Sequence, residues 1–397
     1  MAPNSPTCVF PELRERRPIF ETPAFSLVSR YHDVMSVLER SAQFSVRLYG
    51  AKMDEVVGPF MLGRDQAVQN YRDKSLMRVA MPLSDLPSVR VMVREATQKL
   101  LPTGAGQVDI IKAVCRPVPI ELCGSYFGYT GPDIESMLRW SKTAQSDFFK
   151  NLTNDPAVHA AAVAAGTEFK EYLAGFVRER SEAIQTDPAA ARPTVADRLI
   201  QMSRESGLGF DTDAMIANLA GLLIGAVETT SQAVAHAVEQ ILLRPPVAAR
   251  AVAAAQAGPE GDGELAGLVW EALRLNPINP LLFRFTETDT LLGEGSAHAR
   301  TISAGTVVLA CTASAMWDDT VVERADDFRP NRPSFCYLHF GPVDHECLGR
   351  QVAEVMVPEM IRVLLLRNAS LIPGEAGAID LQGGPFPESF VVHLDAH

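Results

Sequence analysis

One cysteine in this sequence of 397 residues stands where a sulfur ligand to a cofactor metal would stand. Cys347 closes the segment FGPVDHEC, and an apolar run with helical periodicity begins at Arg350. At a helix N-terminus, unpaired N–H groups and the helix dipole favour a thiolate, and metal coordination would complete the deprotonation. Gly341 and Gly349 let the backbone approach a flat cofactor closely. The residues predict a thiolate ligand; the alternative is an ordinary buried thiol in a loop before a helix.

A pair of opposite charges lies in the segment LVWEALRLNP, which has the pattern of a helix. Glu271 and Arg274 are three residues apart and share one helix face. Most such pairs are exposed and contribute little. The apolar neighbours of this pair favour a buried position, where it would need further partners. The loop 328–332 is the candidate for supplying them.

A second interruption of an apolar helix lies at GAVETT, residues 225–230. Thr229 can bond back to the carbonyl four residues earlier and distort the helix. Together with Glu228, it could hold dioxygen and a water relay over a cofactor. The alternative is a polar patch on an amphipathic helix. Two cations, Arg284 and His345, could pair with carboxylates of the cofactor, or could equally be surface charges.

The elements that must position these residues are mainly helical. Apolar residues at helical spacing predict helices over 86–101, 159–184 and 213–243. Strand-like segments occur near both ends, at 25–30, 288–311 and 388–394. An irregular loop at 326–349 is too long for a simple connection, and such loops are usually functional. We expect a mainly α fold with a minor β component, in one domain over 1–397 with an irregular segment over 1–25.

Composition excludes one class of partner. The 36 Lys and Arg against 48 Asp and Glu give a net charge of −12, whereas nucleic-acid binding requires a basic surface. Neither a secretory signal core nor a spanning apolar stretch is expected, which favours a cytoplasmic protein without a membrane anchor. The six scattered cysteines fit free thiols in a reducing cytosol. They are Cys8, Cys115, Cys123, Cys311, Cys336 and Cys347.

In order and spacing, these residues resemble the cytochrome P450 superfamily. The family's haem loop reads Phe-x-x-Gly-x-His/Arg-x-Cys-x-Gly, its K helix carries Glu-x-x-Arg, and its I helix carries Ala/Gly-Gly-x-Asp/Glu-Thr. The resemblance implies a triangular, mostly helical fold with haem b between the I and L helices. Several independent motifs in one order make the match specific, and it covers the chain from the fifties onward. The positions that match are Phe340, His345, Cys347 and Gly349 in the loop, Glu271 and Arg274, and Ala226, Glu228 and Thr229.

The sequence departs from the family pattern at four places. Val343 replaces the second glycine of the haem loop and cannot take a positive φ cheaply, which predicts an altered turn. Gly225-Ala226 replaces the more common Ala-Gly order, which argues against the groove-forming distortion of the I helix. Lys74 and Arg78 stand in place of the usual His-x-x-x-Arg, and either could bind a haem propionate. Pro358 in the expected L helix predicts a kink or a missing hydrogen bond.

The activity that the resemblance implies is that of a haem-thiolate monooxygenase acting on a small, largely apolar substrate. Thr229 and Glu228 would manage protons, and Cys347 would ligate iron. Electrons would come from NAD(P)H through a separate ferredoxin and reductase. Two alternatives remain open: a peroxide-dependent or peroxide-rearranging enzyme, and a catalytically silent haem protein that binds a hydrophobic ligand.

Overall fold

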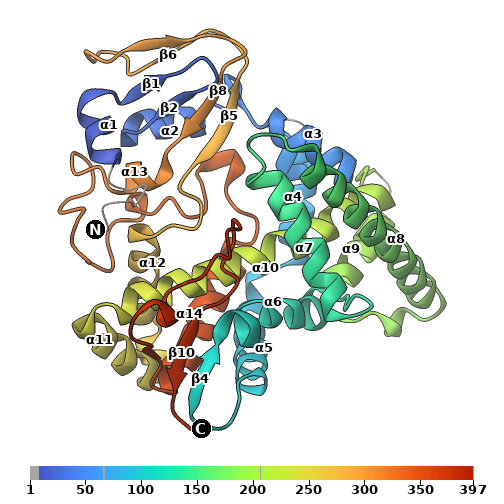
Figure 1. The fold of residues 1–397 in the computed structure, drawn as a ribbon. Coiled ribbons are helices and arrows are strands. Elements are labelled where there is room, and N and C mark those ends of the chain that lie inside the picture. Colours follow the sequence, from blue (N-terminus) through green and yellow to red (C-terminus); the bar gives the residue numbers. More distant parts are fainter. Residues whose placement is uncertain (1–8, 66–67, 206, 397) are drawn as a thin grey trace.

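A computed structural model of the chain describes residues 9–65, 68–205 and 207–396, so Cys8 lies outside the described residues. Helices dominate the described part, and the outline is roughly triangular (Figure 1). The helices are α1 (Phe10–Arg16), α2 (Tyr31–Glu39), α3 (Arg47–Val56), α4 (Val68–Ala80), α5 (Leu86–Leu100), α6 (Pro117–Leu122), α7 (Ile134–Phe149), α8 (Pro156–Thr186), α9 (Val195–Ser203), α10 (Thr212–Leu242), α11 (Pro245–Gln256), α12 (Asp262–Leu275), α13 (Thr312–Met316) and α14 (Arg350–Leu366).

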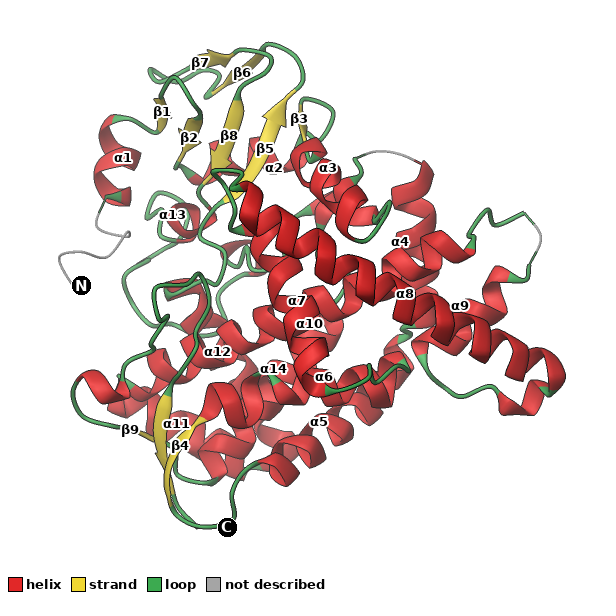
Figure 2. Cartoon of the chain, turned by 45° about the vertical axis from the view of Figure 1, so that its right-hand side comes forward, coloured by secondary structure: helices red, strands yellow, loops and turns green. Residues whose placement is uncertain are grey.

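Short strands gather at two ends of the molecule (Figure 2). The main sheet has the order β1-β2-β8-β5-β3, a second has β4-β10-β9, and β6 pairs with β7. In the main sheet, Arg284 of β5 lies opposite Val308 of β8 in an antiparallel pair. The strands are β1 (Ile19–Glu21), β2 (Ser26–Val28), β3 (Phe44–Ser45), β4 (Gly106–Asp109), β5 (Leu282–Thr286), β6 (Thr290–Leu292), β7 (Arg300–Ile302), β8 (Val307–Ala310), β9 (Ser370–Leu371) and β10 (Val391–Leu394).

Helix α10 runs through the centre of the fold (Figure 1). Asp211 caps it by accepting a hydrogen bond from the backbone N–H of Ala214, which satisfies one of the otherwise unpaired N–H groups of the first turn. Among the described residues, α10 alone is long and apolar enough to cross a membrane, but 78% of its most apolar window is buried inside the protein. That burial is typical of a core helix.

The expectation of an irregular segment over 1–25 is wrong for its described part, because α1 and β1 form there. Pro11 stands in the first turn of α1, where its missing N–H costs no intrahelical bond. Glu12 in the first turn and Arg16 in the last complement the helix dipole, and Phe10 is buried. Closely spaced prolines and charges therefore define a short helix here.

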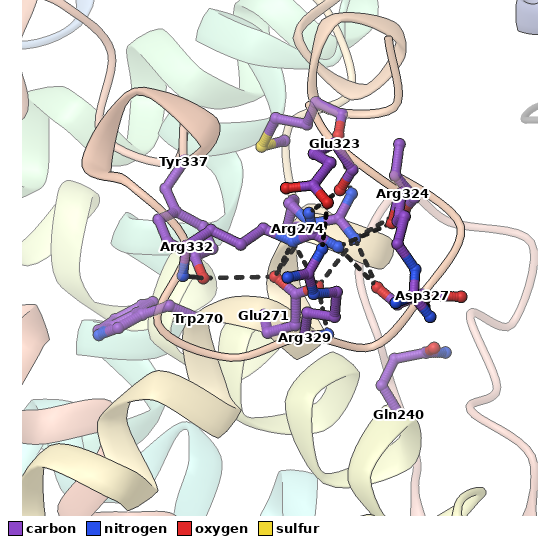
Figure 3. A network of polar contacts seen from close by, with 12 residues as sticks. Gln240, Trp270, Glu271, Arg274, Glu323, Arg324, Asp327, Arg329, Arg332 and Tyr337 are labelled. Atoms are coloured by element: carbon purple, nitrogen blue, oxygen red, sulfur yellow. Dashed lines mark hydrogen bonds and ion pairs between the residues drawn. The ribbon is translucent and has the colours of Figure 1, made fainter. Parts of the chain in front are cut away.

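A buried charge cluster fixes the loop that precedes Cys347 (Figure 3). Glu271 and Arg274 of α12 are both fully buried and form two hydrogen bonds, of 2.8 and 3.0 Å. The partner that the sequence required is Arg332, whose Nε donates to Glu271 Oε1 at 3.0 Å. The Arg329 backbone N–H and the Tyr337 hydroxyl also donate to this carboxylate. One buried carboxylate thus joins α12 to three points of the loop.

Between Tyr337 and Cys347, the same loop makes further contacts with α12. His339 Nε2 lies 3.0 Å from the carbonyl oxygen of Trp270, and burial lowers the pKa of His339 to about 4, so the ring is neutral and donates. The rings of Trp270 and Phe340 pack edge to face, 5.4 Å apart. The carbonyl of Phe340 then accepts a 2.7 Å hydrogen bond from the backbone N–H of Cys347. A continuous series of contacts therefore runs from Glu271 to Cys347.

We expect Glu271→Gln to lower the free energy of unfolding by about 3–5 kcal/mol, because it leaves Arg274 and Arg332 buried without a counter-charge. Denaturant unfolding measures this change. The matched control is Glu12→Gln, which removes an exposed pair with Arg16 and should change stability by less than about 0.5 kcal/mol. Similar losses in the two variants would contradict a structural role for the cluster.

Candidate active site

A cavity of about 330 Å³ lies between α10 and the segment that carries Cys347. Cys347 and the first turns of α14 line one side, and Ala226 and Thr229 of α10 line another. Arg284 of β5 and Lys74 of α4 also reach the cavity wall. Residues from four distant parts of the sequence therefore share one enclosed space.

Cys347 lines this cavity and is exposed there. Burial raises the pKa of the thiol, while the backbone N–H of Gly349, the ammonium of Lys74 and the backbone N–H of Arg350 oppose this shift. All three would stabilise a thiolate once a metal displaced the proton. Gly349 caps α14, which continues unbroken to Leu366.

Pro358 lies inside α14 and interrupts its hydrogen bonding without ending the helix. As a proline it has no N–H to donate to the carbonyl four residues earlier. Of the two expected effects, a kink or a missing hydrogen bond, the missing hydrogen bond follows directly from the proline. The residue is buried against the core.

The turn at Val343 keeps a left-handed backbone, with φ of +52° at a β-branched residue. The expectation of an altered turn is therefore wrong: the chain adopts the conformation usual for glycine and bears its steric cost. Gly341, two residues earlier, has φ of +69°, and a Cβ there would lie 3.3 Å from the carbonyl oxygen of His345. The Val343 side chain is 59% exposed, so no packing offsets the strain.

Helix α10 presents its smallest side chains to the cavity. Gly225 and Ala226 line it, and a Cβ at Gly225 would have open space around it. The hydroxyl of Thr229, which also lines the cavity, donates to the carbonyl of Gly225. The helix remains α throughout, so this back-bond does not open a groove. This part of α10 therefore gives the cavity small side chains, followed by the threonines Thr229 and Thr230.

Glu228 lies on the other side of α10 and is fully buried. Arg116, between the π-helical turn Ile111–Cys115 and α6, approaches its carboxylate with two nitrogens, at 2.9 and 3.0 Å. Arg116 also bonds Glu388 at 2.9 Å, and Glu388 bonds Lys142 at 2.7 Å, where the lysine is 43% exposed. Burial raises the pKa of Glu228, although Arg116 opposes the shift. Charged groups thus connect the helix with the surface.

Three basic residues line the cavity near Cys347. Arg284 is 4% exposed, and burial lowers its pKa, which Tyr49 and Asp65 partly offset. His345 Nε2 is 3.2 Å from Asp65 Oδ1. Lys74 donates to the backbone carbonyl of Asp344 at 2.7 Å.

The remaining predicted cation, Arg78, is not among the residues that line the cavity. Its side chain is 56% exposed and pairs with Glu346 at 3.5 Å. Phe340 and Gly349 do line the cavity. The structure therefore brings together the predicted residues of the loop, α10 and β5, with Lys74 as the residue of α4 that reaches them.

Comparison with solved structures identifies the fold. A cytochrome P450 of Mycobacterium smegmatis, solved without ligand, superposes with a TM-score of 0.81 at 20% identity and covers 98% of this chain and 96% of its own. A second, from Bacillus megaterium and solved with testosterone, gives 0.80 at 19% identity, with 98% of each chain covered. These likenesses confirm the predicted fold class.

The sequence model of the cytochrome P450 family matches residues 132–380, which is more than half of the chain. The chain belongs to the cytochrome P450 family. This confirms the predicted family, and membership implies haem as the cofactor.

Named relatives are similar at low identity. A steroid C26-monooxygenase of Mycolicibacterium smegmatis is 22% identical over 96% of this chain and 90% of its own length. The mycinamicin IV hydroxylase/epoxidase of Micromonospora griseorubida is 26% identical over 90% and 86%. A bifunctional dioxygenase-epoxy alcohol synthase of Pyricularia oryzae is 29% identical over 46% of this chain, which spans only 15% of that protein.

The residues around the cavity fit a haem. Arg284 and His345 line the cavity, and two of their buried nitrogens, Arg284 Nε and His345 Nδ1, have no partner among the described residues; the carboxylates of a haem would supply one. Gly225 and Ala226 line the same cavity as Cys347, and the open space beside Gly225 leaves room for a cofactor. We propose that these residues hold the haem, with Cys347 as its ligand.

Two functional residues were not found from the sequence. Arg116 precedes the motif PVPIEL and carries no local sign of its partner Glu228, 112 positions away. Asp65 holds His345 and also accepts from the backbone N–H of Val46. Only three-dimensional proximity reveals either contact. The unusual pair of prolines after Arg116 was the one available signal of a constrained backbone.

We expect Val343→Gly to raise the free energy of unfolding by about 1 kcal/mol, since relief of left-handed strain exceeds the added flexibility of the unfolded chain. Thermal unfolding of the haem-loaded protein measures the change. Gly341→Ala is the counterpart and should destabilise, because it adds a side chain at positive φ. A Val343→Gly variant less stable than the parent would show that the turn is not strained.

Proposed function

We propose that the protein is a haem-thiolate monooxygenase that inserts one atom of dioxygen into a small, largely apolar organic substrate in secondary metabolism. One observation carries the proposal: Cys347 and Thr229 line a single, mostly apolar cavity together with Arg284 and His345, each of which keeps one buried nitrogen without a partner among the described residues. The names of the relatives matched over most of their length support the reaction class, and a hydroxylase/epoxidase of mycinamicin among them supports secondary metabolism.

The haem, when bound, supplies the reductive activation of dioxygen. Cys347 provides a sulfur ligand whose charge the neighbouring N–H groups and Lys74 stabilise. Thr229 uses its own proton to bond Gly225, so its oxygen remains free to accept a hydrogen bond from a water in the cavity. The hydroxyl therefore orients a water beside the reacting centre.

Glu228 holds the proton that must reach this water. Its raised pKa lets it carry a proton closer to neutral pH than an exposed glutamate would. Arg116, Glu388 and Lys142 connect it with solvent. A rotation of the carboxylate from Arg116 toward Thr229 would complete the transfer.

Electrons are proposed to come from NAD(P)H through a separate ferredoxin and ferredoxin reductase. We place the reaction in the cytoplasm, where such reductants are available. The haem fold is proposed to form one domain over 1–397.

We expect Cys347→Ala to lose the red-shifted Soret band that the reduced, carbon monoxide-treated protein should give. Cys311→Ala, which truncates a buried cysteine elsewhere, is the control and should retain the band. A red-shifted band that persists in Cys347→Ala would place the ligand on another residue.

We expect Thr229→Val to keep substrate binding but to divert most NADPH consumption from oxygenated product, because the variant cannot orient water. Glu228→Gln should lower turnover about tenfold or more with the haem retained. Product formed per NADPH, with ferredoxin and reductase supplied, measures both effects. The control is Thr143→Val, an exposed helix hydroxyl on α7. NADPH consumption by the parent without any oxygenated product would instead indicate a silent ligand-binding protein.

A second candidate is a peroxide-dependent or peroxide-rearranging enzyme, which the partial likeness to an epoxy alcohol synthase favours. Such an enzyme needs no external electrons. Turnover with hydrogen peroxide or a lipid hydroperoxide alone, and none with ferredoxin and reductase, would replace the monooxygenase proposal with this one.

A further inference from the structure

Four buried polar side chains that line the cavity carry an atom without a partner among the described residues. Two are the cations Arg284 and His345, which the haem accounts for. The other two are neutral amides, Gln145 of α7 and Asn218 of α10. A buried amide without a hydrogen bond destabilises the folded protein unless a ligand satisfies it. These two amides therefore indicate what the substrate must present.

The amide of Asn218 has a fixed orientation. Its Nδ2 donates to Asp73 Oδ2 at 3.1 Å and to the carbonyl of Ala214 at 2.7 Å. Asp73 is itself fully buried and held by Arg72 at 2.7 Å. Both protons of the Asn218 amide are thus used, and Oδ1 is left as a buried acceptor without a partner among the described residues, in a residue that lines the cavity. Only a hydrogen-bond donor can satisfy it.

Gln145 is 5% exposed, and its amide forms no hydrogen bond with the described residues. It lies one turn beyond Ser141, whose hydroxyl donates to the carbonyl of Leu223 and so fixes α7 against α10. Phe148 and Phe149 follow it on the cavity wall. Gln145 is therefore an unpartnered polar group in apolar surroundings, able to donate or to accept.

The two ends of the cavity along α10 are far apart. Asn218 lies eleven residues before Thr229, which is about 16 Å of helix rise. Between them, the ring of Phe60 packs on Gly221 and lines the cavity as an apolar contact. A molecule that reaches both ends must be elongated and apolar in its middle.

We propose that the substrate is an elongated, apolar molecule whose end remote from the oxidised carbon carries a hydroxyl or N–H group that donates to Asn218 Oδ1, with Gln145 as a second polar contact. This inference rests on the proposed function, because it takes the oxidised carbon to lie beside Thr229. It makes Asn218 and Gln145 specificity-determining residues, with Asp73 as the positioning residue that fixes the polarity of Asn218.

The test compares alcohols with their methyl ethers, which differ only in the donor. Dodecanol and dodecyl methyl ether form one pair, and a tricyclic alcohol and its methyl ether form another. Calorimetric titration of the ferric haem protein gives the dissociation constants. We expect at least one alcohol to bind about tenfold more tightly than its ether, the discrimination typical of an acceptor left unpaired.

Two variants test the residues separately. Gln145→Leu should raise the thermal midpoint of the ligand-free protein by about 2 °C, because it removes an amide without a partner, and should lower the alcohol preference about threefold. Asp73→Asn should abolish the preference, since the new amide can donate to Asn218 Oδ1 and turn the free end of Asn218 into a donor. It keeps the shape of a buried side chain, whereas Asn218→Leu would remove the donor to Asp73 Oδ2.

The matched control is Thr312→Val, a buried hydroxyl on the cavity wall that already donates to the carbonyl of Asn279 at 2.7 Å. It should keep the tenfold preference. Equal affinity for alcohol and ether in both pairs, or no measurable binding of any of the four compounds, overturns the inference. The reduced carbon monoxide spectrum of each variant separates the claims: a red-shifted band without the preference leaves the proposed function intact.

Discussion

The buried carboxylate of Glu271 is the interaction on which the architecture around Cys347 depends. A charge taken out of water is costly unless several donors satisfy it, and here Arg274, Arg332, a backbone N–H and the Tyr337 hydroxyl do so together. The donors come from α12 and from a loop with little regular structure of its own. Because the carboxylate cannot be left unpaired, it forces that loop into one conformation. Contacts of His339 and Phe340 with Trp270 of α12 then hold the segment that carries Cys347.

Several polar side chains that line the cavity, unlike Glu271, are buried without a full set of hydrogen bonds. Arg284 and His345 near the thiol, and Gln145 and Asn218 farther along, are buried but keep atoms without partners. The carboxylate of Glu271, by contrast, accepts hydrogen bonds from four donors. We propose that bound molecules complete the bonding of these four side chains. In the proposed arrangement, Arg284 and His345 contact the acidic groups of the cofactor, and the two amides contact a substrate that donates a hydrogen bond.

The family, the mainly helical fold and the positions of α5, α8 and α10 could be predicted from the sequence, because apolar periodicity and local motifs encode them. The joint presence of Cys347, Thr229 and Arg284 on one cavity followed from the resemblance. Contacts between distant segments could not be predicted. The sequence around Arg116 does not indicate its contact with Glu228, and the sequence around Asp73 does not indicate its contact with Asn218. Local rules misjudged two places. Val343 tolerates a left-handed backbone because neighbouring contacts determine the turn, and Phe10 anchors a helix in a segment rich in proline and charge.

The central claim is that Cys347 binds the iron of a haem in this cavity. Iron K-edge X-ray absorption of the purified ferric protein tests it most directly, because sulfur scatters differently from nitrogen and oxygen at the first coordination distance. The account predicts one sulfur neighbour of the iron in the parent protein and none in Cys347→Ala. An iron site with only nitrogen and oxygen neighbours in the parent, or one whose sulfur survives the substitution, would contradict it.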